Sequence, residues 1–391
     1  MRVARPRESE PIRLVETGRG WRYRVVLDVG ERPDGRRRQV TRTAGTLTEA
    51  RAFVAETRAD VARGTYTQPD ALTFDGLCVR WLDSRRDIRE NTRMGYEQVL
   101  KPVRGRLGER RAQDLRRSDI EALVSWRAGD GGQRGKGLSQ RSIVLTLGAV
   151  RQLLAHGVAE GLLPVNVAVG VRAPRRQRSD ARKVAVWDVS DLLRFREAAD
   201  ADEWAAGWRL TLCGLRRSEV LGMRWQAVDV AAGTARVEAA RVALDGHRTA
   251  TDDPKSAASW RTVPVESMHP GTVALFRSLS ARQAADRLAA GSAYVDTSYV
   301  LVDALGQPIR PEAFSDRFAA LCRSSGVPPI RMHDVRHSVA LMLHRAGQAP
   351  ADVAALLGHS VQTHLSIYVP RTERGAQSAA TALGDVLAAA R

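Results

Sequence analysis

A short basic segment divides the chain, and it limits the possible folds more than any other stretch. Residues 171–183 hold five arginines and one lysine against a single aspartate, and Pro164 and Pro174 lie before and within it. A segment of this composition has no apolar face to bury, so we expect it to be extended and solvated. We therefore predict a multidomain protein in which 171–183 is a basic interdomain linker.

Residues 1–68 carry the signals of a small β-sheet followed by a helix. Apolar and polar residues alternate over 21–27 and again over 36–41, on either side of a Pro-Asp-Gly turn, which predicts a hairpin. Thr46 and Glu49 then have the spacing of a capping box at the start of a helix. The 68 residues contain 15 arginines and no lysine against nine acidic residues. A solvated sheet face and a sheet that reads DNA both fit this charge.

Residues 69–170 have a wholly helical pattern with room for four or five helices. Apolar residues at helical spacing predict one buried stripe, formed by Ile143, Leu147, Val150 and Leu154. Basic residues cluster around this core, as a bundle that grips DNA requires. They are Arg85, Arg86, Arg93, Lys101, Arg104, Arg106, Arg110, Arg111, Arg116, Arg117, Arg134, Lys136 and Arg141.

The net charge of the whole chain limits the kinds of molecule that it is expected to bind. A formal net charge of +17 and a pI near 10.9 predict attraction to a polyanion, although charge alone does not decide for nucleic acid.

Cys78, Cys213 and Cys322 are too far apart to indicate a disulfide framework or a zinc knuckle. No apolar run approaches the roughly 20 residues of a bilayer span, and the N-terminus lacks the apolar core of a signal peptide. We expect a cytoplasmic protein with no membrane partner.

Residues 184–391 predict a mainly α-helical domain with a small antiparallel sheet. Helical patterns come first, two strand-like runs over 235–242 and 261–265 are joined by a polar hairpin, and helices follow. The predicted fold class is therefore multidomain: a small sheet plus helix, an all-α bundle, and an α+β domain. A tail helix over 372–391 could dock on a neighbouring protomer or pack on its own domain.

An ordered set of side chains in this second part could act on a phosphate. Arg216 and Glu219 are three positions apart, so the carboxylate can hold the guanidinium in place. Tyr368 is a poor nucleophile at its unperturbed pKa of about 10 and needs cations or a base nearby. In chain order the set is Arg216, Glu219, Lys255, His333, Arg336, His359 and Tyr368.

The spacing of the apolar residues before Tyr368 predicts the direction in which its side chain points. Val361, Leu365 and Tyr368 fall on one helical face, which predicts that the tyrosine points inward. His333 and His337 are four residues apart and also suggest a zinc helix, but the glutamate of an H-E-x-x-H motif is absent and Arg336 would repel a metal. We therefore expect neither a metal nor a cofactor.

Each of these residues has a structural interpretation when it is taken alone. Arg216 could be an ion-paired surface residue, Lys255 a loop lysine and Tyr368 a half-buried packing residue. Taken together, in this order and after a basic helical segment, the motifs resemble the tyrosine recombinases, or phage-type integrases. The resemblance is strongest from Thr211 to Tyr368.

The resemblance implies a role for each residue. Arg216 and Arg336 would bind the non-bridging oxygens of the scissile phosphate, and Tyr368 would attack its phosphorus to form a 3′-phosphotyrosyl link. Lys255 would protonate the departing 5′-oxygen, Glu219 would support Arg216, and His333 and His359 would assist proton transfer and phosphate contacts. His337 is expected to be a structural hydrogen-bonder.

The resemblance also implies domains and partners. Residues 1–68 would bind arm sites, 69–170 would bind core sites, and 184–391 would be catalytic. The partners would be double-stranded DNA attachment sites and a homotetramer on synapsed DNA, with a recombination directionality factor and a DNA-bending protein as candidate accessories. The product would be integration or excision of a mobile element such as a phage. A type IB topoisomerase and a catalytically inactive DNA-binding protein remain as alternatives. His364 departs from the family pattern and is a titratable group one turn before Tyr368.

Overall fold

A computed structural model describes residues 4–18, 20–31, 36–132, 135–175, 185–244, 248–252 and 260–368, with six further residues between 380 and 388. The chain divides into two compact units, Met1–Asp180 and Ala181–Arg391. The mixture of mostly helical units with small antiparallel sheets confirms the predicted multidomain α+β class.

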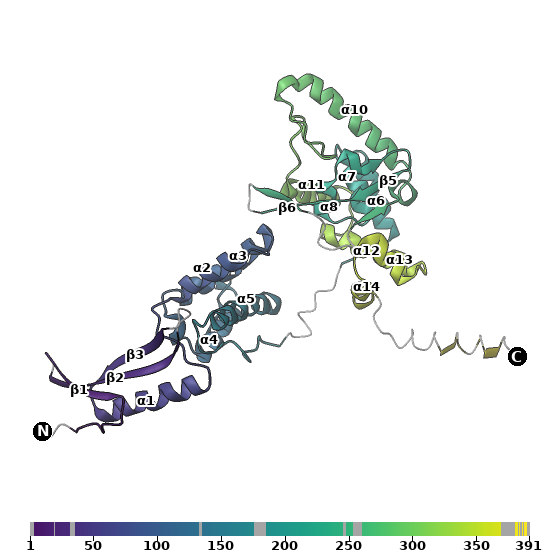
Figure 1. Cartoon of the computed structure of the whole chain (residues 1–391). Helices are drawn as coiled ribbons and strands as arrows, with labels where there is room; N and C mark the ends of the chain where they lie inside the picture. The colour runs from purple at the N-terminus through teal and green to yellow at the C-terminus, as the bar shows by residue number, and fades with distance from the viewer. Residues whose placement is uncertain are drawn as a thin grey trace. The chain divides into compact units, whose positions relative to one another are not determined.

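The first unit begins with a three-stranded antiparallel meander and one helix. Alternate residues of the central strand are buried, namely Tyr23, Val25 and Leu27, because one face of the sheet lies against the helix. The helix runs beside this sheet in Figure 1 and begins with the predicted Thr46 and Glu49 capping box. The elements are β1 (Ile12–Thr17), β2 (Gly20–Glu31), β3 (Arg37–Ala44) and α1 (Leu47–Ala62). Strand β1, which pairs with β2, was not predicted.

Four α-helices follow in the described part of the first unit, with a short 3-10 turn between two of them. The predicted stripe of Ile143, Leu147, Val150 and Leu154 is buried at the centre of their core. The helices are α2 (Phe74–Ser84), α3 (Glu90–Leu107), α4 (Arg117–Gly129) and α5 (Gln140–Ala159), with η1 (Ala112–Asp114) between α3 and α4. In the described part of the chain, α5 alone is long and apolar enough to cross a membrane. It packs against α2, α3 and α4, and this explains its apolar composition.

The second unit surrounds a single large core. The aromatic rings of Trp187, Phe195, Trp208, Phe314 and Phe318 pack against one another within it, and those of Trp208 and Phe314 are stacked. Its first elements are α6 (Val189–Asp200), α7 (Ala205–Leu212), α8 (Arg217–Gly222), η4 (Trp225–Ala227), β4 (Val228–Asp229), β5 (Thr234–Val237), β6 (Ala240–Ala243), β7 (Thr249–Asp252) and β8 (Arg261–Val263). The later ones are α9 (Val265–Met268), α10 (Thr272–Ala290), η6 (Gly291–Ala293), α11 (Pro311–Ser324), α12 (Met332–Arg345), α13 (Pro350–Leu357) and α14 (Val361–Tyr368).

The strands of this unit correct one prediction. The run 235–242 is not a single strand that pairs with 261–265. Its first part, β5, pairs with β4 and β8, and its second part, β6, pairs with β7 in a separate two-stranded sheet. The run divides because β6 leaves the first sheet to lie against α8, where residues 239 and 241 approach Gly222 closely. The turn predicted near 245–246 and most of the tail 372–391 lie outside the described residues.

Candidate active site

The turn between α7 and α8 places Arg216. Gly214 has a φ of +82°, a left-handed conformation that favours glycine, and a Cβ here would lie 2.6 Å from the Leu357 side chain. Arg216 then occupies the N-cap of α8, and its backbone N–H donates to the Glu219 carboxylate over 2.9 Å. The side chain of Arg216 therefore starts from a fixed backbone position.

Glu219 is a buried carboxylate shared by two arginines. Its Oε1 accepts from Arg216 Nη1 over 2.6 Å, and its Oε2 accepts from Arg261 Nη2 over 2.9 Å. The side chains of Glu219 and Arg261 are only 5% and 7% exposed. Burial by itself raises the pKa of Glu219, but the hydrogen bonds and charges of Arg261 and Arg216 outweigh it and hold the pKa below the usual value. The carboxylate therefore stays ionised and orients Arg216.

Sequence reasoning missed Arg261. It stands at the first position of β8, where it was read as an ordinary residue of a predicted strand. The distance of 42 residues between Arg261 and Glu219 hid the pairing.

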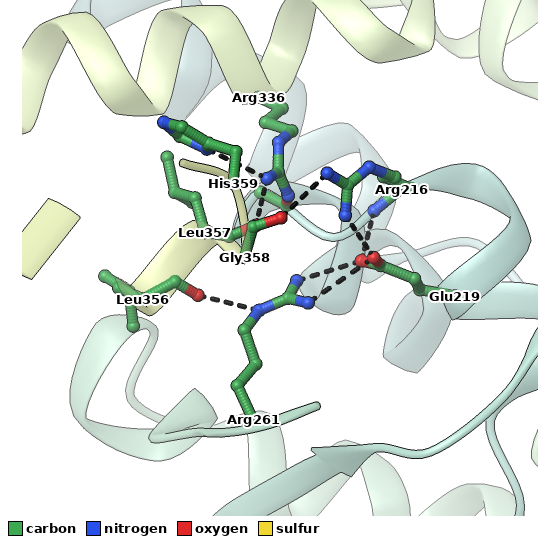
Figure 2. A network of polar contacts seen from close by, with 9 residues as sticks. Arg216, Glu219, Arg261, Arg336, Leu356, Leu357, Gly358 and His359 are labelled. Atoms are coloured by element: carbon green, nitrogen blue, oxygen red, sulfur yellow. Dashed lines mark hydrogen bonds and ion pairs between the residues drawn. The ribbon is translucent and has the colours of Figure 1, made fainter. Parts of the chain in front are cut away.

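Three arginines bind three successive carbonyls at the C-terminal end of α13 (Figure 2). Arg261 Nε donates to Leu356 O over 2.8 Å, Arg336 Nη2 to Leu357 O, and Arg216 Nη2 to Gly358 O over 2.8 Å. The last carbonyls of a helix lack intrahelical partners and carry partial negative charge. Gly358 ends α13 with a φ of 65°, so its left-handed cap turns these carbonyls toward the arginines.

Arg336 joins His359 to this group. It is 3% exposed on α12, and its Nη1 donates to Gly214 O over 2.9 Å. Its Nη2 lies 3.1 Å from His359 Nδ1. Arg216, Arg336 and His359, which come from three separate segments, thus meet around the backbone of residues 357–359.

The two candidate histidines are neutral at neutral pH. Burial, followed by the charge of Arg336, lowers the pKa of His359 to about 4. Loss of water around the ring, followed by the charges of His337 and Arg336, lowers the pKa of His333 to about 4. Much of the His333 surface is nevertheless exposed, so water screens part of these charges. The His333 and His337 rings meet edge to face, 4.9 Å apart. The described residues contain no cluster of His, Cys, Asp and Glu suited to a metal ion.

The structure changes the expectation for the helix that carries Tyr368. Val361 and Leu365, which were expected to share a buried face with Tyr368, are 41% and 44% exposed, so the expectation is wrong for these two residues. The inward direction of Tyr368 itself stays a prediction. Among the side chains of α14 that the structure describes, His364 is the buried one, and its ring lies against His359. Tyr368 is the last residue of α14, and its side chain lies outside what the structure describes, as does the whole of Lys255.

Comparison with known proteins agrees with this geometry. Residues 189–374 match the family model described as the phage integrase family. A XerC-like tyrosine recombinase of Caldanaerobacter subterraneus is 26% identical over 65% of this chain and 68% of that protein. The ICEBs1 integrase of Bacillus subtilis is 25% identical over 91% of this chain and 94% of that protein.

A solved structure extends the likeness to the fold. The Tn1549 transposon integrase, residues 82–397 in complex with transposon right end DNA, superimposes with a TM-score of 0.64 at 18% identity. The match covers 80% of this chain and 99% of the solved chain, residues 82–397 of that integrase. With the match over 189–374, which contains Arg216, Arg336, His359 and Tyr368, these findings assign the chain to the tyrosine recombinases of the phage integrase family.

Proposed function

We propose that this site-specific recombinase cuts and rejoins DNA through Tyr368, and that it integrates or excises a mobile element. One observation carries the assignment of residues. Arg216, Arg336 and His359 meet around the backbone of residues 357–359, which directly precede the helix that ends at Tyr368. Two fixed cations and a hydrogen-bonding imidazole beside a tyrosine are the groups that an attack on a phosphodiester needs.

In the proposed reaction, Arg216 and Arg336 bind the two non-bridging oxygens and stabilise the charge that grows on them. The bond between the Tyr368 oxygen and phosphorus forms while the bond from phosphorus to the 5′-oxygen breaks. His333, neutral at physiological pH, accepts the phenol proton, and Lys255 gives a proton to the departing 5′-oxygen. The 3′-phosphotyrosyl link keeps the energy of the broken bond, so attack by a 5′-hydroxyl reseals the strand.

The proposed DNA contacts follow the division of the chain. We assign arm-site binding to residues 1–68, core-site binding to 69–170, strand chemistry to 184–391, and a tether along the backbone to 171–183. The net charge of +17 supports a polyanionic partner. We further propose that four copies act on two synapsed attachment sites, with a directionality factor and a DNA-bending protein as accessories.

A covalent trap tests the proposal. The substrates are a library of nicked duplexes with a randomised central sequence. Cleavage releases a short fragment from such a duplex, so the strand cannot be rejoined and the protein stays bound to the 3′ end. We expect wild type to form an adduct that survives denaturation, at sequences that recover on reselection. Tyr368→Phe, which keeps the ring but lacks the hydroxyl, is expected to form none.

The same trap separates the alternatives. An adduct at most sequences, with no strand exchange between two selected sites, would indicate a topoisomerase. Retention of duplexes without any adduct would indicate a DNA-binding protein that has lost catalysis. An adduct that persists in Tyr368→Phe would refute the nucleophile assigned here.

A further inference from the structure

His364 is a fully buried histidine that the proposed chemistry leaves without a task. It is 0% exposed, although its helix α14 is short and its neighbours Val361 and Leu365 are open to solvent. Burying a polar ring costs free energy unless its nitrogens are hydrogen-bonded. The ring lies against His359, one of the groups assigned to the phosphate, so its partner indicates its role.

The hydrogen bonds around His359 locate the proton of that ring. Arg336 Nη2 is 3.1 Å from His359 Nδ1, and a guanidinium can only donate a hydrogen bond. The Nδ1 atom therefore accepts and carries no proton. Because burial and the charge of Arg336 lower the pKa of His359 to about 4, the ring is neutral at pH 7 and its single proton sits on Nε2.

The Nε2–H group of His359 has an acceptor on α14. His359 Nε2 and His364 Nδ1 are 3.3 Å apart, and the two ring planes are within 14° of parallel. Since the proton belongs to His359, the Nδ1 atom of His364 accepts, and a neutral His364 carries its own proton on Nε2. Donation thus runs in one direction, from Arg336 to His359 and from His359 to His364.

We propose that His364 is a positioning residue that presents His359 to the scissile phosphate as a hydrogen-bond donor. Because His364 Nδ1 accepts a hydrogen bond from His359 Nε2–H, the His359 ring is held with this N–H group pointing away from Arg336. When DNA binds, a non-bridging oxygen of the phosphate becomes a second acceptor for the same N–H group. In a flipped ring, a lone pair would face the anionic phosphate and repel it. The proposal rests on the proposed function, in which His359 contacts that phosphate.

The arrangement requires His364 to be neutral. Protonation of Nδ1 would remove the acceptor and would place a second donor against His359. Among the described residues, two titratable groups face His364. They are His359, which precedes α14 in the chain, and His344 on α12, whose ring centroid lies 6.0 Å from that of His364. Arg336 contacts the other ring nitrogen of His359. Burial and the charge of His344 lower the pKa of His364, so the acceptor is present at neutral pH and is lost on acidification.

Two substitutions at position 364 separate the role of the side chain as a hydrogen-bond acceptor from its role in packing. His364→Asn keeps a side-chain oxygen near the place of Nδ1, and that oxygen cannot be protonated in the range where histidine titrates. His364→Leu fills the same space without an acceptor. Single-turnover cleavage of a selected nicked duplex at pH 7.5 is expected to be within about threefold of wild type for Asn and about tenfold slower or worse for Leu. His344→Ala, which leaves both rings of the pair in place, is the matched control and is expected to match wild type.

The pH profile adds a readout that packing would not move. Cleavage by wild type is expected to fall on acidification, and the midpoint of that fall is expected at lower pH for His364→Asn. Wild-type rates for His364→Leu, equal losses for folded Asn and Leu variants, or identical profiles for wild type and Asn would each overturn the proposal.

A measurement without DNA separates this inference from the proposed function. In long-range ¹⁵N–¹H spectra of the full chain labelled at histidine, His359→Asn identifies the resonances of ring 359. Those of wild type are expected to show a neutral ring protonated at Nε2 and to shift in His364→Leu. A ring protonated at Nδ1, or resonances indifferent to His364→Leu, would refute the contact. If the spectra show the expected contact but wild type forms no DNA adduct, the proposed function is wrong, while the hydrogen bond between His359 and His364 is still supported.

Discussion

At the scale of single residues, the Glu219 carboxylate is buried and is paired with two arginines. Arg261→Met removes the partner that is itself 7% exposed and leaves Glu219 buried with Arg216 alone. We expect a loss of about 3 kcal/mol in the free energy of unfolding, the low end of the cost of breaking a buried pair, because Arg216 still offsets the charge. The midpoint of urea unfolding measures it.

The control for this change is Arg287→Met. Arg287 pairs with Asp296, but the two side chains are 51% and 58% exposed, so water already screens them. The midpoint is expected to stay near that of wild type. Equal shifts for the buried and the exposed pair would contradict the importance given to Glu219.

Lys255 lies outside the described residues, so its role is best tested by the chemistry of the leaving group. If the scissile 5′-oxygen is replaced by sulfur, the leaving thiolate needs no proton, because a thiol has a pKa of about 8.5, far below that of an alcohol. Lys255→Ala is expected to cleave the oxygen substrate slowly and the sulfur substrate at nearly the wild-type rate.

Arg216→Lys supplies the contrast, because its defect concerns the non-bridging oxygens. It is expected to stay impaired on both substrates in single-turnover cleavage. If sulfur restores Arg216→Lys as well, or fails to restore Lys255→Ala, then Lys255 is not the acid.

At the scale of elements, the C-terminal end of α13 organises the site by binding three arginines through consecutive carbonyls. Gly358 sets their direction through its left-handed backbone. Gly358→Ala is expected to destabilise the unit by about 1–2 kcal/mol and to slow cleavage further, because the carbonyl bound by Arg216 shifts. Urea unfolding and single-turnover cleavage together measure the two effects.

A second glycine separates these two effects. Gly347 follows α12 with a φ of +80°, and a Cβ there would meet nothing within 4 Å. Gly347→Ala should therefore have a similar backbone cost while cleavage stays at the wild-type rate. Loss of cleavage in both variants would show that stability alone explains the result.

The elements also show how far sequence reasoning could reach. Helices with a regular apolar stripe, such as α5, were predicted because burial repeats along one face. Strands β5 and β6 were merged, since an apolar run does not reveal where a chain changes sheets. Helix α14 misled for a different reason: Val361 and Leu365 are exposed in the isolated chain, and the buried residue among its described side chains is a histidine that contacts another histidine.

The candidate site divides in the same way. Arg216 and Glu219 could be paired from the sequence because three positions bring them together locally. Arg261 could not, because its contact with Glu219 depends on how β8 lies beside α8. The contact between His359 and His364 depends equally on tertiary structure, since five positions along the chain did not specify which nitrogens would meet.

At the scale of the whole molecule, the stabilities of the two units are expected to respond differently to acid. The first unit has a single histidine, His156, whereas burial lowers the pKa of several histidines in the second. These are His269, His333, His337, His359 and His364. Each binds its proton less tightly in the folded unit than in the unfolded chain, where the pKa is about 6.5. The unfolded state therefore takes up more protons below that pH.

The sign of the effect follows directly. The stability contributed by these neutral histidines is complete above about pH 6.5 and is lost as pH falls toward about 4, the value for His333 and His359. In calorimetry of the full chain, the transition that Arg261→Met lowers identifies the second unit. We expect it to move to lower temperature between pH 7 and pH 4.5, by more than the transition of the first unit. A transition of the second unit that is flat across this range would mean that its buried histidines are not neutral, and the donor chain from Arg336 through His359 to His364 would fail with it.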